Sequence, residues 1–180
     1  NDLCVSKEGT IYFTDPPFGL DRSDPDAREL DFSGVYSLSQ NGELHMLIKD
    51  LERPNGIALS PDEKTLYVSN SNPRQYMAYK LSADGFSVSN GRILFDASEL
   101  YESSISKQSP DGMAVNSEGI LFCTGPDGVL VLAPDGKHLG TIRTNKKTSN
   151  CDLNEDETVL YVTCDDYILR VILGYKLGFN

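Results

Sequence analysis

Positive charge and long apolar runs are both scarce in this chain of 180 residues. Lysine and arginine number 16 against 27 aspartate and glutamate residues, so the formal net charge is −11. Nucleic acids and anionic membrane surfaces are unfavourable partners, because binding them requires a basic stripe that this sequence lacks. No apolar run approaches the roughly 20 residues that span a bilayer. The chain starts at Asn1, so a targeting segment would lie outside it; we expect a soluble protein, with the cytoplasm favoured.

Histidine and cysteine are too few or too scattered to indicate several common catalytic sites. The two histidines, His45 and His138, both fall in predicted outer strands, which disfavours a zinc or non-haem iron centre built on imidazole. A serine hydrolase is disfavoured because there is no G-x-S-x-G turn and no histidine placed to serve a nucleophile. The four cysteines show no C-x-x-C spacing and lie in apolar strand segments, so we expect buried thiols. They are Cys4, Cys123, Cys151 and Cys164.

The residues that are abundant indicate an all-β protein. Apolar residues make up 39% of the chain and charged residues 24%, which is enough apolar side chain to build a core. Strand patterns recur along the whole sequence, and no stretch shows a convincing helical period. Pairs such as Asn41-Gly42 and Asp135-Gly136 suit tight hairpins, because both residues tolerate positive φ.

One sequence pattern occurs four times in the chain. A side-chain amide or carboxylate is followed by a short apolar run, a turn and a second β-rich run. The clearest copies are PNGIALSPDEKTLYV at 54–68 and PDGMAVNSEGILFC at 110–123. The side-chain amides or carboxylates that begin the four copies are those of Asn1, Asn55, Asp111 and Asn150.

Repeats at roughly 40–55 residues, with about four strand patterns in each, are typical of β-propeller blades. We therefore predict one propeller domain over residues 1–180, with blade-like units near 1–50, 51–97, 110–144 and 149–175. The fourth unit lacks its outermost strand. We expect a fragment of a larger propeller or an incomplete ring, whose unpaired edges favour self-association.

Three segments closely resemble the SMP-30/gluconolactonase family: YFTDPPFGL at 12–20, RPNGIALSPD at 53–62 and SPDGM at 109–113. The resemblance covers nearly the whole chain, in the same order and spacing. It implies a six-bladed propeller that binds a divalent metal, usually Ca²⁺, in the central channel. It also implies hydrolysis of sugar lactones, other lactones or, in some relatives, organophosphates. Mg²⁺, Mn²⁺ and Zn²⁺ are the alternative ions.

The residues that begin the four repeats are called heads below, and they supply the candidate metal ligands. In a propeller, the start of each innermost strand faces the axis, and Asn and Asp oxygens are hard ligands that suit Ca²⁺, Mg²⁺ or Mn²⁺. By resemblance, Asn55 and Asp111 match metal ligands, and Asn1 matches a residue that binds the metal or the substrate. Asp2 matches a carboxylate that lies behind the ligands in some relatives, and Ser149-Asn150 matches a pair beside the channel; Asp2 and Asn150 are both candidate substrate contacts. The family's remaining ligand is a glutamate that would lie before Asn1.

The resemblance also implies a mechanism. A metal with an open face would polarise the lactone carbonyl while water attacks it, and Asp111 is the candidate general base. The acidic connection 16–32 either covers the channel mouth, with Phe18 shaping the pocket, or is a solvated loop. The connection 97–109 leads directly into Asp111.

Two other classes of function remain open. One is a non-catalytic metal-binding propeller that acts as a scaffold for a partner. The other is a condensing enzyme like the strictosidine-synthase relatives, which share the fold. Metal-dependent turnover of a small-molecule lactone would favour the hydrolase over both.

Overall fold

Alternating apolar residues and tight turns fold the chain into four antiparallel sheets, each a meander of consecutive strands. The computed structural model describes residues 1–180 except 22, 25, 145 and 175–180. The first sheet contains β1 (Leu3–Val5), β2 (Ile11–Asp15), β3 (Gly34–Leu38) and β4 (Leu44–Ile48). The second contains β5 (Pro54–Leu59), β6 (Thr65–Asn70), β7 (Gln75–Leu81) and β8 (Val88–Asp96). The third contains β9 (Met113–Val115), β10 (Leu121–Gly125), β11 (Gly128–Leu132) and β12 (His138–Arg143). The fourth contains β13 (Thr148–Leu153), β14 (Val159–Cys164) and β15 (Tyr167–Ile172).

The sheets are arranged as blades of a propeller, which confirms the predicted fold class. The first strands of successive sheets lie against one another, β1 against β5, β5 against β9 and β9 against β13. The fourth sheet has three strands within the described residues, as the sequence pattern predicted. Ile168 and Ile172 on β15 are 69% and 68% exposed. Association through this edge stays a prediction.

One helix was not expected. The helix α1 (Ser98–Ser103) lies in the connection between the second and third sheets. Six residues are too few to show a helical period in the sequence, which explains why the pattern did not predict it. Within the described residues, no helix is long and apolar enough to cross a membrane.

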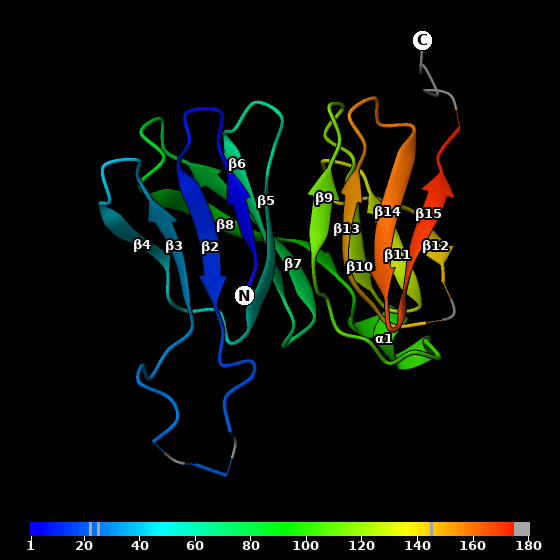
Figure 1. Cartoon of the computed structure of the whole chain (residues 1–180), viewed down its shortest axis with the longest axis horizontal. Coiled ribbons are helices and arrows are strands. Elements are labelled where there is room, and N and C mark those ends of the chain that lie inside the picture. The colour runs from blue at the N-terminus through cyan, green and yellow to red at the C-terminus, as the bar shows by residue number, and fades with distance from the viewer. Residues whose placement is uncertain (22, 25, 145, 175–180) are drawn as a thin grey trace.

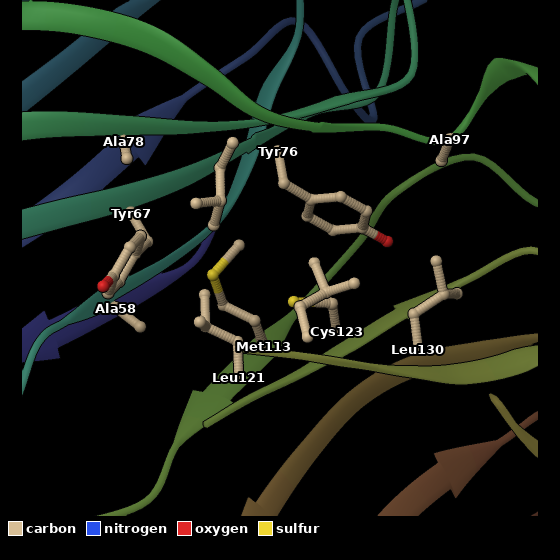
Figure 2. Close-up of a cluster of buried hydrophobic side chains, with 11 residues drawn as sticks. Ala58, Tyr67, Tyr76, Ala78, Ala97, Met113, Leu121, Cys123 and Leu130 are labelled. Carbon is tan, nitrogen blue, oxygen red and sulfur yellow. The ribbon is translucent and has the colours of Figure 1, made fainter. Parts of the chain in front are cut away.

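The apolar core lies between neighbouring sheets rather than within one sheet. The largest cluster joins the second and third sheets, where Tyr67 and Tyr76 face Met113 and Leu121 (Figure 2). The Tyr76 hydroxyl donates a hydrogen bond of 2.8 Å to the Thr124 carbonyl, so this buried polar atom is satisfied. Similar clusters lie between the first and second sheets and between the third and fourth. This packing holds the first strands of the four sheets side by side.

The long connections gather at one end of the molecule. The connection between β2 and β3 and the helix α1 both lie at this end, at the bottom of Figure 1. The arrows of β1, β9 and β13 point away from it, so these strands begin there. The unit heads, which come at or just before these strand starts, therefore lie at the same end of the molecule as the two connections.

Candidate functional site

The structure brings the heads of all four units into contact. The Asp2 carboxylate accepts a hydrogen bond of 3.3 Å from the Ile57 backbone N–H, and the Asn150 side-chain nitrogen lies 3.5 Å from it. The Gly112 N–H donates to the Ser149 carbonyl at 2.9 Å. Residues up to 148 positions apart in sequence thus form one polar cluster.

Hydroxyl side chains on the second strand of the first three blades hold the head of the next blade. The Thr14 hydroxyl donates to the Asn55 carbonyl at 2.7 Å, and the Ser69 hydroxyl donates to the Asp111 carbonyl at 2.7 Å. The Thr124 hydroxyl lies 3.2 Å from the Ser149 carbonyl. Our sequence analysis did not single out these residues. A hydroxyl at the same place in each repeat, including Thr163, was the signal that could have revealed them.

Glycine follows both candidate ligands because neighbouring blades approach closely. A Cβ atom at Gly56 would lie 2.3 Å from the Asp111 carbonyl oxygen, and one at Gly112 would lie 2.2 Å from the Asn150 side-chain oxygen. Real Cβ contacts are essentially never this short. Gly56 is therefore a packing requirement, because its neighbour is backbone, whereas the neighbour of Gly112 is a side chain that can shift. Local turn chemistry does not reveal either contact.

Asn55 is the most informative side chain of the cluster. It is 6% exposed, and its Nδ2 donates a hydrogen bond of 3.0 Å to the Ser71 hydroxyl. Its Oδ1 is buried and has no hydrogen-bond partner among the residues that the structure describes. Buried polar atoms without a partner are rare and costly, so an unpaired carbonyl-type oxygen points to a missing electropositive ligand. A hard cation fits this position.

The carboxylates of Asp111 and Asp2 in this cluster are partly buried. Burial raises the pKa of Asp111 to about 6; the nearby charge of Asp2 also raises it, while the Asn55 amide and the Gly112 N–H oppose the increase. Burial likewise raises the pKa of Asp2. The ion pairs found within the described residues involve neither carboxylate. A bound cation would relieve this cost.

The donor set relies on amide as well as carboxylate oxygen. In the part of the chain that the structure describes, no three His, Cys, Asp or Glu side chains gather into a metal-binding group. An ion held here by this chain would therefore need amide or backbone oxygen besides carboxylate, and Asn55 and Asp111 are the candidates. The chemistry of these two residues suits a hard oxygen-seeking ion.

The raised pKa of Asp111 predicts how the stability of the metal-free protein depends on pH. We expect the free energy of unfolding to fall as the pH rises from about 4 to about 6, because this carboxyl has a pKa of about 6 when folded against 3.8 ordinarily. Below this pH window the Asp111 carboxyl is protonated in both the folded and the unfolded protein. Above the window its buried charge lowers the free energy of unfolding by about 2 kcal/mol, after allowance for its partial exposure. Urea unfolding in chelator at both ends of the window measures the change.

Asp111→Asn is the control for this pH effect. The variant cannot ionise at position 111, so it should lose the larger part of the pH dependence, while Asp2 retains the rest. An unchanged pH profile in the variant would assign the effect to other groups.

The other predicted site residues have different surroundings, and of these only Asp2 and Asn150 belong to the polar cluster described above. Asp2 and Asn150 line a cavity of about 470 Å³ along the inner strands, and the Asn150 Oδ1 is oriented by the Cys151 N–H at 2.8 Å. Asn1 is exposed, and within the described residues no hydrogen bond joins its side chain to Asn55 or Asp111. Phe18 lines a separate cavity of about 260 Å³, which lies between the 16–32 connection and Arg53.

Histidine and cysteine do not form a nucleophilic site in this cluster. His45 in β4 stacks on Phe86 with ring centroids 4.3 Å apart, and His138 lies in β12, so both are on outermost strands. Cys4 and Cys151 line the 470 Å³ cavity, but burial raises the pKa of each to about 12. Both therefore stay as thiols at neutral pH, and neither can supply a thiolate nucleophile.

Comparisons with known proteins identify the relatives of this chain. The family model of the SMP-30/Gluconolactonase/LRE-like region matches residues 1–165. A gluconolactonase from Zymomonas mobilis is 39% identical over 176 residues, which cover 95% of this chain and 49% of that protein. Regucalcin from Oryctolagus cuniculus is 30% identical, covering 72% of this chain and 43% of the relative.

Solved structures agree with these sequence matches. The structure of XC5397 from Xanthomonas campestris, described as a gluconolactonase important in glucose secondary metabolic pathways, superposes with a TM-score of 0.82 at 33% identity. The superposition covers 97% of this chain and 57% of that protein. The chain thus spans about half the length of the relatives it matches.

Proposed function

Because the chain belongs to the SMP-30/gluconolactonase/LRE-like family, we propose that it is part of a metal-dependent hydrolase that opens sugar lactones or related cyclic esters. The names of the 39% and 33% identical relatives support lactones as the substrate class. The observation that carries the metal dependence is the buried, unpartnered Oδ1 of Asn55 beside the Asp111 carboxylate.

Asn55 and Asp111 are the proposed metal ligands, and Asn1 is the proposed third residue. Their donors are all hard oxygens, so Ca²⁺ is the favoured ion and Mg²⁺ or Mn²⁺ the alternatives. Zn²⁺ fits less well, because neither imidazole nor thiolate is available at the cluster. When bound, such an ion polarises the lactone carbonyl and stabilises the negative charge that develops on its oxygen.

Asp111 has the properties of a general base in this proposal. In the metal-free protein its pKa of about 6 leaves it ionised at neutral pH, and a bound cation would lower that pKa, so it is ionised in both states. It can therefore accept a proton from the attacking water. Asp2 and Asn150 line the 470 Å³ cavity, a volume within the roughly 300–1,000 Å³ of small-molecule sites, and are the proposed contacts to the sugar hydroxyls. Phe18 and Asn1 would bound the mouth of the channel.

Metal removal tests the proposal. Full-length protein is assayed for opening of glucono-δ-lactone by acid release at constant pH, with the spontaneous rate subtracted. We expect a chelator to abolish the enzymatic rate and added Ca²⁺ to restore it. Tight Ca²⁺ binding without turnover would indicate a binding scaffold instead. A lactonase rate that ignores the chelator would contradict the metal dependence.

A further inference from the structure

Ser71 lies at the junction between the two candidate ligands. It follows β6, and its backbone N–H donates to the Arg53 carbonyl at 2.9 Å, which ties it to the strand that carries Asn55. Its hydroxyl donates to the Pro110 carbonyl at 2.7 Å, immediately before Asp111. The same hydroxyl accepts the hydrogen bond from the Asn55 Nδ2 at 3.0 Å. One side chain thus bridges the heads of two blades.

The direction of these bonds determines which way the Asn55 amide faces. The Pro110 carbonyl can only accept, so the single hydroxyl hydrogen of Ser71 must point toward it. Ser71 then presents a lone pair to Asn55, and the atom of Asn55 that faces Ser71 must be the donor nitrogen. Consequently Oδ1 faces away from Ser71 into the cluster, where it has no partner among the described residues.

The reversed amide would lose a hydrogen bond. If Oδ1 of Asn55 faced Ser71, one hydroxyl hydrogen would have to serve both that oxygen and the Pro110 carbonyl. The reversed amide would also direct its N–H groups to where a cation must approach. We propose that Ser71 is a positioning residue that holds the Asn55 oxygen toward the metal site and links this ligand to the strand of Asp111. The orientation stands on geometry alone; only its consequence for metal binding rests on the proposed function.

Ser69 is a matched control that the chain itself provides. It too donates a hydrogen bond of 2.7 Å to a carbonyl of the third unit's head, that of Asp111. Among the residues that the structure describes, its hydroxyl makes no hydrogen bond to a ligand side chain, whereas that of Ser71 accepts one from Asn55. Removing either hydroxyl costs one bond between blades, but only Ser71→Ala also removes a hydrogen bond of the Asn55 amide, whose interaction with Asp111 remains. The comparison therefore separates positioning from general stabilisation.

The first measurement is made on metal-free, full-length protein by NMR of the Asn55 side-chain amide. In Ser71→Ala we expect the Asn55 amide hydrogens to shift and to exchange about fivefold to tenfold faster, as loss of one hydrogen bond allows. Ser69→Ala should leave them unchanged, and Ser71→Thr, which keeps the hydroxyl, should restore them. Ser71→Cys, which keeps the size but is a weak donor and acceptor, serves if the alanine variant does not fold. An Asn55 amide that is unaffected by loss of the hydroxyl would overturn the proposal.

The second measurement is a calorimetric titration with Ca²⁺ alone. We expect Ser71→Ala to weaken Ca²⁺ binding by roughly tenfold or more, the usual effect of removing a residue that orients a ligand. Ser69→Ala should weaken Ca²⁺ binding less than Ser71→Ala does, because it removes a hydrogen bond to the Asp111 backbone but none to a ligand side chain. Equal weakening in both serine variants would mean that Ser71 only stabilises the fold. If the unsubstituted protein binds no Ca²⁺, the proposed function fails, while the NMR measurement still decides the orientation of Asn55.

Discussion

Replacing Asp111 with asparagine should lower the rate of lactone hydrolysis by at least roughly 100-fold, the lower end of a general-base contribution. The substitution keeps the shape of the side chain and one oxygen donor, but removes the negative charge and the base. Ca²⁺ affinity should fall at the same time, because affinity rises with the charge of the ligands. Initial rates and calorimetric titration of the full-length variant measure the two effects.

Excess Ca²⁺ separates the two roles of Asp111. If the variant regains the full rate at saturating Ca²⁺, Asp111 only holds the metal; if the rate stays low, it also handles the proton. Asp50→Asn, the same change at an exposed position, is the control and should keep the normal rate. Hydrolysis that ignores both the Asp111 substitution and a chelator would refute the metal-lactonase proposal.

Gly56→Ala should be the most destabilising small substitution at the site. The added Cβ would lie 2.3 Å from the Asp111 carbonyl oxygen and 2.7 Å from the Gly112 Cα, both backbone atoms that cannot rotate away. We expect a loss of about 2–3 kcal/mol in the free energy of unfolding, as is typical of overpacked positions. Separation of the second and third unit heads should also weaken metal binding. Urea unfolding and Ca²⁺ titration test the two consequences.

Two other glycines calibrate this experiment. Gly112→Ala would meet the Asn150 side chain, which can shift, so its cost should be smaller. At Gly140, in the outer strand β12, no atom lies within 4 Å of an added Cβ, and alanine should be nearly neutral. If Gly56→Ala is as stable as Gly140→Ala, the close approach of the two heads is not a constraint on the fold.

The repeated pattern of the sequence was sufficient to predict the blades. Strand positions depend on short-range alternation and on turn residues, and pairs such as Asp135-Gly136 mark their hairpins without reference to the rest of the chain. The same pattern also predicted that the fourth sheet has three strands within the described residues and that both histidines lie on outer strands. The oxygen-bearing heads at Asn55 and Asp111 were visible because they recur in register.

Only the tertiary structure determined how those heads are held. The direction of the Asn55 amide depends on Ser71 and on the Pro110 carbonyl 55 positions away, and the raised pKa of Asp111 depends on burial and on Asp2. Neither can be deduced from local sequence, because each arises where separate blades meet. A repeat specifies what every blade contains, whereas the energy of the site depends on contacts between blades, and these exist only after the sheets have packed.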